Sequence, residues 1–401
     1  MNGVTFWGAV IHIPFVPDTI NLPDLKLNIL NALPIRVRRA FMETAIDLSP
    51  EGASLADAQP HLPRRLSPVG YCLLLVLLPL VAIPALITLG RSDFFLHHGA
   101  SVWVQANDKV FDTRQRQCDV LIYGDSTAMT GIDPDRVEEQ TGFRTCNIAV
   151  TNAVLAVTGN LTLDHFLANN PKPKVLLIQL SPDGFQPESS LWHHTIYAEG
   201  MLELLRHGQP AATRRLLLTH PAESVAFAGY AAGYTAWYGI KSVWYHATSL
   251  RPEEDTVQVR NGFFTPPSPA RTSCEAATTI VSGSNPQQIA FSRSIVANYL
   301  HSYSDQAAVV LVNVAPIPEC DQNLAAYTAE LDGITSNSVL TMPVGYFNNC
   351  CHYTARGSEI VSSLISSELN TVASENPRIS DRTPPTRPVA ALHRIRLHLQ
   401  R

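Results

Sequence analysis

The chain has 401 residues, 45% of them hydrophobic and only 16% charged, and its net charge is −5. This length fits one large domain or two ordinary ones, and the apolar content is ample for a buried core. Because the charge balance is slightly acidic, the composition excludes the basic footprint of a nucleic-acid-binding protein.

Residues 1–68 carry few signs of a fold. Pro14 and Pro17 interrupt the apolar start of the chain, and residues 52–68 are polar and Pro-rich, as is typical of a linker. A short amphipathic helix is predicted over residues 25–45. We expect a weakly ordered cytoplasmic segment or, if translation starts downstream, a stretch that is not made.

The segment from Val69 to Gly90 reads VGYCLLLVLLPLVAIPALITLG and holds no charge over 22 residues. A helix that spans a bilayer needs about 20 apolar residues. Pro79 and Pro84 would disturb a soluble helix more than a membrane helix. The segment therefore predicts one transmembrane helix at residues 69–90. The alternative is a buried core helix in a cytosolic enzyme.

The arginines that flank this segment predict its orientation. Five precede it and one follows it closely: Arg36, Arg38, Arg39, Arg64, Arg65 and Arg91. Because cytoplasmic flanks are enriched in Lys and Arg, we expect a single pass with a cytoplasmic N-terminus. The main domain would then lie on the periplasmic side of a bacterial inner membrane.

Seven cysteines are spread along the chain without a CxxC motif or a zinc-binding spacing. If the main domain is exported, Cys274 and Cys320 could pair as a disulfide. The alternative is that most of the cysteines are small buried apolar residues.

From about residue 118 the sequence alternates between strand and helix patterns. Strands are predicted at residues 120–123, 144–150, 174–180, 307–314 and, more weakly, 338–343. Helices are predicted between and after them, at residues 134–141, 152–168, 287–303, 323–331 and 357–369. Asp133 before Pro134 is a typical helix start. Strands joined by helical crossovers predict a parallel sheet in a three-layer α/β domain over residues 118–370.

Residues 184–285 break this rhythm and predict a largely helical insertion above the carboxyl edge of the sheet, where open α/β sheets bind ligands. The insertion is rich in Trp and Tyr, which stack on sugars and pack on acyl chains but more often simply pack. His193 and His194 lack a third ligand at a readable spacing, so no metal site is predicted. Residues 371–401 hold six arginines and several prolines and are expected to be a disordered tail.

The motif IYGDS places Ser126 directly after the strand at residues 120–123. A serine on such a strand-to-helix turn exposes its hydroxyl at the carboxyl edge of the sheet, where backbone N–H groups can stabilise an oxyanion. Ser126 is therefore a candidate nucleophile. The alternative is helix capping, since Asp125 and Ser126 are both good N-cap residues.

His352 stands between the last predicted strand and the last predicted helix, in YFNNCCHYTARGSEI. In a parallel sheet this part of the chain lies beside the exit of the first strand. We therefore expect His352 to approach Ser126 and to supply the base that a hydroxyl nucleophile requires. Asn349, three residues earlier, is expected to hold the imidazole in the needed tautomer.

The IYGDS motif, the polar residue three positions before His352 and the HYTARG motif together resemble the SGNH/GDSL hydrolase superfamily. The resemblance covers about residues 118–370 and points in particular to the membrane-tethered bacterial branch of envelope acyl-transfer and esterase-like proteins. It implies a flavodoxin-like sheet of about five parallel strands, with Ser126 as the nucleophile and His352 as the general base.

Three positions depart from the family pattern. The aspartate of the D-x-x-H unit is Asn349, which can orient the histidine but cannot stabilise an imidazolium by charge. Thr151 and Asn152 stand where the family has an oxyanion glycine, and a backbone N–H of either could serve instead. The asparagine of the third motif is missing from LIQLSPDGF, where Ser181 could donate one hydrogen bond and Asp183 is an alternative acid.

Together with these residues, the resemblance implies a serine esterase or acyltransferase that needs no cofactor and acts on acyl esters of an envelope glycan or lipid. Its catalytic and oxyanion or substrate-binding residues would be Ser126, His352, Asn349, Asn152, Thr151 and Ser181. The rival hypothesis is a catalytically degenerate SGNH-fold protein that binds carbohydrate or serves as a scaffold in envelope biogenesis. It is favoured because the loss of a single oxyanion donor can cost about 3–4 kcal/mol.

Overall fold

The computed structural model describes a large part of the 401-residue chain. The described residues are 5–6, 9–10, 67–98, 102–111, 114–186, 200, 203–204, 206–207, 214, 218, 221–248, 259–266, 269–274, 285–348 and 351–379. The helix expected over residues 25–45, the pair His193 and His194, and Asn349 lie outside them.

The chain divides into two compact units, Met1–Tyr71 and Cys72–Arg401. In the first unit, the short strands β1 (Thr5–Phe6) and β2 (Ala9–Val10) pair in antiparallel fashion. The second unit holds the elements that position the candidate site.

Helix α3 (Pro68–Gly90) covers the predicted membrane segment and includes both Pro79 and Pro84. The helix is therefore present where the sequence predicts one. By length and hydropathy, however, none of the helices in the described part of the chain qualifies as a membrane-crossing helix. The predicted crossing at residues 69–90 is not confirmed.

The main sheet has four parallel strands in the order β4-β3-β5-β6. Their bounds are β3 (Val120–Gly124), β4 (Thr145–Asn147), β5 (Val175–Leu180) and β6 (Val309–Val314). Every residue of β3, β4 and β5 is buried. The sequences of the central strands β3 and β5 are apolar runs because both faces of these strands are covered.

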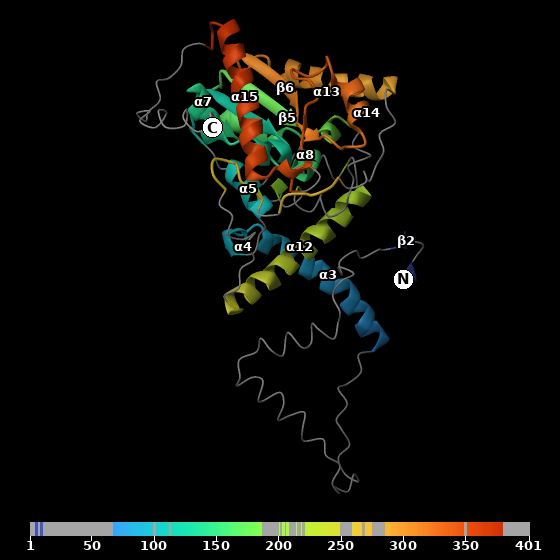
Figure 1. The fold of residues 1–401 in the computed structure, drawn as a ribbon. Coiled ribbons are helices and arrows are strands. Elements are labelled where there is room, and N and C mark those ends of the chain that lie inside the picture. Colours follow the sequence, from blue (N-terminus) through green and yellow to red (C-terminus); the bar gives the residue numbers. More distant parts are fainter. Residues whose placement is uncertain are drawn as a thin grey trace, which may run out of the picture. The chain divides into compact units, whose positions relative to one another are not determined.

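Helices cover the sheet on both faces, and two hydrophobic clusters fill the space between the layers. On one face, Val120, Ile122 and Leu177 pack with residues of α5 (Val102–Phe111), α6 (Ser126–Gly131), α7 (Pro134–Thr141) and α15 (Ala355–Glu375). In Figure 1, α15 lies beside β5 and β6. On the other face, the strands pack with residues of α9 (Leu161–Asn169) and α13 (Pro286–Tyr303). The domain is thus α/β with three layers, an arrangement compatible with a flavodoxin-like fold.

The helix starts follow local sequence signals. Asp133 caps α7 by accepting a hydrogen bond from the backbone N–H of Asp135, with Pro134 at the first helical position. The helix expected over residues 152–168 is divided into α8 (Asn152–Thr158) and α9, because Gly159 between them adopts a positive φ of 57°.

The expected fifth strand at residues 338–343 does not join the main sheet. Only Thr341–Met342 is extended, as β8, and it pairs in parallel with β7 (Ile317–Pro318). The open edge of β6 is occupied by side chains instead: Ser336 Oγ and Asn337 Oδ1 accept hydrogen bonds from the backbone N–H groups of Val312 and Val314. Among the described residues the main sheet therefore has four strands and not about five.

Further elements complete the described chain. They are α4 (Asp93–His98), the 3-10 turns η1 (Pro182–Phe185) and η4 (Val344–Tyr346), α12 (Pro221–Thr248) and α14 (Leu324–Leu331). Helix α12 lies inside the predicted insertion. Helix α15 continues to Glu375, so residues 371–375, expected in the disordered tail, belong to a helix.

Two disulfides cross-link the domain. Cys274 pairs with Cys320, as the sequence allowed for an exported domain. Cys118 pairs with Cys146, which the sequence did not predict and which joins the beginning of β3 to β4. The alternative that these four are simply small buried residues is wrong.

Candidate active site

Ser126 is the first residue of α6 and follows a tight turn at the end of β3. Gly124 makes this turn with a positive φ of 150°, and a Cβ atom there would lie 1.8 Å from the carbonyl oxygen of Gln179 on β5. Only glycine fits such a close approach of two backbones. The GDS motif therefore requires glycine at position 124 for a steric reason.

Asp125 holds the turn in place from inside the protein. Its Oδ1 accepts hydrogen bonds from Thr127 N (2.9 Å) and Thr127 Oγ1 (2.6 Å). Its Oδ2 accepts from both the backbone N–H and the hydroxyl of Ser181, each at 2.7 Å. The carboxylate thus caps α6 and ties it to the end of β5, and it leaves the hydroxyl of Ser126 without a capping role.

Ser181 was expected to donate a hydrogen bond to an oxyanion. Both of its donors point to Asp125 instead. In this arrangement Ser181 supports the turn that carries Ser126.

His352 meets Ser126 across the domain, although 226 residues separate them. The Nε2 atom of His352 lies 2.9 Å from the Oγ atom of Ser126, which is a hydrogen-bonding distance. Two backbone contacts shape the loop around His352: a bridge between Phe347 and Tyr353, and a hydrogen bond from Asn348 N to His352 O. The nucleophile and the base that the sequence suggests are therefore neighbours.

The beginning of α15 fixes the other side of this loop. Thr354 caps the helix by accepting a hydrogen bond from Gly357 N, and its own N–H donates to Tyr346 O. A Cβ atom on Gly357 would lie 2.2 Å from Tyr346 O. The sequence HYTARG thus contains the helix cap, Thr354, and the glycine, Gly357, that together position His352 beside Ser126.

Trp103 of α5 covers the imidazole. Its ring centroid lies 4.7 Å from that of His352, with the ring planes tilted by 38°, and a second contact of 4.7 Å joins it to Phe264. Sequence analysis missed Trp103 and the whole of α5. The apolar positions Trp103, Ala106 and Val110, spaced i, i+3 and i+7, are the signal that would have revealed this helix.

Burial lowers the pKa of His352 from its ordinary value of 6.5 to about 4. The imidazole is therefore neutral at pH 7 and its Nε2 can accept the proton of Ser126. The same shift makes it a weak base, because general bases work best with a pKa near the operating pH.

Thr151 and Asn152 lie beside the Ser126 turn, since the N–H of Val150 donates to the carbonyl of Gly124. The N–H of Thr151, an expected oxyanion donor, is used internally: it donates to Oδ1 of Asn107 at 3.0 Å. Asn152 begins α8 and is half-buried. Its side-chain amide makes no hydrogen bond within the described part of the chain, so it is the better placed of the two candidates.

Asp183 and Asn349 complete the predicted set. Asp183 accepts a hydrogen bond from the hydroxyl of Tyr327 on α14, at 3.0 Å, and burial raises the pKa of its carboxyl. Asn349 lies outside the described residues, so its role in orienting His352 stays a prediction.

Comparison with family models, with curated proteins and with solved structures found no match for this chain. The resemblance to SGNH hydrolases therefore stays an expectation drawn from the motifs. Any functional argument must rest on the geometry around Ser126 and His352.

Proposed function

We propose that the protein is a serine esterase or acyltransferase of the SGNH type. The observation that carries the proposal is the 2.9 Å contact between Ser126 Oγ and His352 Nε2, at the carboxyl edge of a parallel sheet. A hydroxyl becomes an effective nucleophile when a base lies within such reach.

The proposed reaction has two halves. Ser126 Oγ attacks the acyl carbonyl while His352 Nε2 takes the hydroxyl proton, and the proton then passes to the departing alkoxide. This leaves an acyl ester on Ser126. Water or a sugar hydroxyl then gives its proton to His352 and attacks that ester, which releases the acid or the new ester and restores the hydroxyl of Ser126.

Two donors would hold the oxyanion of the intermediate. One is the backbone N–H of Ser126, because the first N–H groups of a helix have no acceptor within that helix. The other is Asn152, which lies next to the turn and keeps its side-chain amide available. Neither Ser181 nor the N–H of Thr151 has a role here, since both donate to internal acceptors.

We further propose that this domain works outside the cytoplasm of a bacterium, held at the inner membrane. Two disulfides support an oxidising compartment. Helix α3 supports attachment, since it carries no charge and exposes a set of large apolar side chains: Val69, Tyr71, Leu73, Leu74, Leu77, Leu78, Leu80, Val81 and Leu89. The substrate class that suits this place is an acyl ester of an envelope glycan or lipid. Membrane fractionation tests the location, and recovery of the chain in the soluble fraction would refute it.

The catalytic proposal is tested by Ser126→Ala in the full chain, assayed on p-nitrophenyl acetate and by labelling with a fluorophosphonate probe. Removing the nucleophile should reduce turnover about 10³-fold or more and abolish labelling. The matched control is Ser294→Ala, an exposed serine of α13. Equal turnover and labelling in the two variants would remove Ser126 from the mechanism.

The second candidate function is binding without catalysis, by a scaffold protein that recognises an envelope glycan. It is favoured by the low pKa of His352 and by the internal use of the Ser181 and Thr151 donors. This function predicts glycan binding that survives Ser126→Ala, with no covalent labelling of the wild-type chain.

A further inference from the structure

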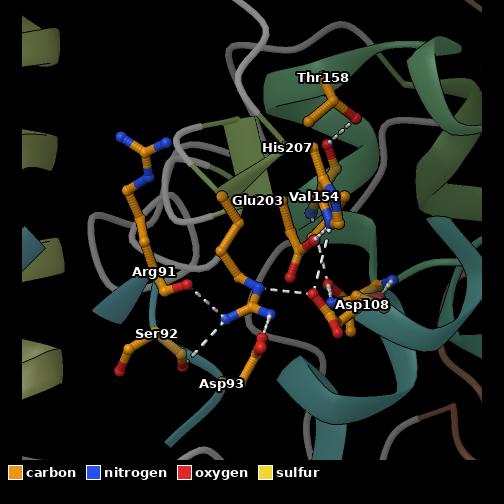
Figure 2. Close-up of polar contacts among 11 residues, drawn as sticks. Arg91, Ser92, Asp93, Asp108, Val154, Thr158, Glu203 and His207 are labelled. Carbon is orange, nitrogen blue, oxygen red and sulfur yellow. Dashed lines mark hydrogen bonds and ion pairs between the residues drawn. The ribbon is translucent and has the colours of Figure 1, made fainter. Parts of the chain in front are cut away.

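A second cluster of polar side chains lies away from Ser126, between α5 and the segment around residue 205. Asp108 comes from α5, and Glu203 and His207 come from one helical turn, in which His207 N donates to Glu203 O. Figure 2 shows the imidazole of His207 in contact with both carboxylates. The side chains of Asp108, Glu203 and His207 are 5%, 4% and 11% exposed.

The spacing of the three donor atoms suits a metal ion. His207 Nε2 lies 3.2 Å from Glu203 Oε2 and 3.4 Å from Asp108 Oδ1, and all three donor atoms lie within 4.8 Å of one another. Tetrahedral zinc with bonds of about 2.0–2.1 Å requires donor atoms about 3.3 Å apart. The two distances involving the imidazole therefore match a tetrahedral edge before any ion is bound.

Glu203 provides an independent sign of a missing ligand. Its Oε1 atom is buried and has no hydrogen-bond partner among the residues that the structure describes. A buried carboxylate oxygen that stays unpaired costs free energy, and native proteins rarely leave one in this state. A divalent ion between the three side chains would place two positive charges beside this carboxylate.

Arg206 supports the cluster from the side of Asp108. Its Nε bonds to Asp108 Oδ1, and the guanidinium also reaches Asp93 and the carbonyl oxygens of Arg91 and Ser92 (Figure 2). These contacts fix the orientation of Asp108, as outer partners of metal ligands commonly do. Within the described part of the chain, the carboxylate of Glu203 is hydrogen-bonded to His207.

We propose that Asp108, Glu203 and His207 bind a divalent first-row transition-metal ion of the Zn²⁺ class. Two carboxylates and one imidazole are donors that such ions accept. Three protein ligands leave a fourth position for water or another small ligand. The site is separate from the Ser126–His352 pair, and its existence does not depend on the proposed esterase activity.

The site would secure a helix that the candidate active site uses. Helix α5 carries Asp108 and also Trp103, which covers His352, and Asn107, whose amide is hydrogen-bonded to Thr151. An ion bound at Asp108 would tie α5 to the segment with Glu203 and His207. Metal binding is therefore expected to stabilise the wall of the active site without taking part in the reaction.

The alternative to a metal site is a cluster of ion pairs, with a protonated His207 between Asp108 and Glu203. The two possibilities differ in their response to a chelator. An ion-pair cluster keeps its stability in EDTA, whereas a metal site loses stability when the ion is removed.

The experiment uses the purified full chain and Zn²⁺ alone as the probe. After dialysis against Zn²⁺ and then against metal-free buffer, the wild-type chain should retain about one ion per chain. Its melting temperature should fall when EDTA is added. The variants Glu203→Gln and His207→Gln should bind Zn²⁺ at least about tenfold more weakly. The exposed control His301→Gln on α13 should behave like the wild type.

Absorption spectroscopy tests the site independently of melting temperatures, which matters if a variant is unstable. Co²⁺ in place of Zn²⁺ should give visible absorption bands in the wild type that are lost in His207→Gln, with circular dichroism checking that the variant is folded. The proposal is overturned if the wild type retains no more Zn²⁺ than Glu203→Gln. It is equally overturned if EDTA leaves the wild-type melting temperature unchanged while Glu203→Gln lowers it, because that result identifies an ion-pair cluster.

Discussion

His352 and His207 are both largely enclosed by protein, but the groups around them differ. The ring of Trp103 packs against His352, and burial lowers the pKa of the imidazole to about 4. Burial also lowers the pKa of His207, but Asp108 and Glu203 more than offset this effect and raise it to about 9 in the metal-free chain. The position of carboxylates, and not burial as such, decides whether a buried imidazole is neutral or charged.

This comparison explains what the Ser126 site can do. A neutral imidazole accepts a proton from a hydroxyl, but an imidazolium formed in an apolar setting is poorly stabilised. A site with an asparagine at position 349 would therefore work as a Ser-His pair with a weak base.

Replacing His352 by alanine should abolish most of the esterase activity. General-base catalysis contributes about 10²–10⁴-fold, so turnover of p-nitrophenyl acetate should fall by that factor. The control is His301→Ala, an exposed histidine of α13. Turnover that stays within a factor of two of the control would show that the 2.9 Å contact with Ser126 has no catalytic role.

The pH profile of the wild-type chain should reflect the low pKa of His352. The imidazole must be neutral to accept a proton, so kcat/KM should stay constant as the pH falls from 7 and should drop only as it passes through about 4. A histidine in water would lose its activity near pH 6.5. Measurement of kcat/KM from pH 3.5 to 8 distinguishes these cases, and an acid limb near 6.5 would contradict the shielding by Trp103.

Changing Asn349 to aspartate should make the surroundings of His352 resemble those of His207. A nearby carboxylate raises the pKa of an imidazole by about 1–3 units, so the acid limb of kcat/KM should move up by that amount and turnover at pH 7 should rise. Asn298→Asp, an exposed change on α13, is the control for added charge. If both variants keep the wild-type limb, residue 349 does not face the imidazole.

The smallest effect is expected at Trp103. An aromatic contact of this kind contributes about 0.5–1.5 kcal/mol, so Trp103→Ala should lower kcat/KM by about tenfold or less and move the acid limb towards 6.5 as water gains access. Trp103→Phe keeps an aromatic ring over His352 and should lie close to the wild type. An alanine variant with an unchanged limb would show that Trp103 does not set the environment of the imidazole.

Much of the fold could be predicted from local sequence. The apolar runs of β3, β5 and β6 and the Asp133–Pro134 start of α7 are local signals, and all four elements are present. The prediction of a fifth strand failed because the side chains of Ser336 and Asn337 accept the backbone hydrogen bonds at the edge of β6. The hydrophobic periodicity of the sequence does not reveal such side-chain contacts.

The candidate site divides in the same way. Ser126 and His352 could be paired from their motifs, although the last predicted strand, which was expected to bring His352 to the edge of the main sheet, lies outside that sheet as β8. The roles of Ser181 and Thr151 could not, since their donors are taken by Asp125 and by Asn107, the latter from a helix more than 40 residues away. The cluster around Asp108 could not be predicted either, because Asp108 lies 95 residues before Glu203 and 99 before His207 in the sequence.

The bond between Cys118 and Cys146 encloses Ser126 in a covalent ring, with a sequence separation of 28 residues. In the chain-entropy model, closing such a ring lowers the conformational entropy of the unfolded chain and raises its free energy by about 3.6 kcal/mol. Ser126, the proposed nucleophile, therefore lies on a segment whose stability depends on the oxidation of these two cysteines. A chain produced under reducing conditions would have the same residues, but the segment that carries Ser126 would be less stable. Full activity would then require oxidation of Cys118 and Cys146 to the disulfide.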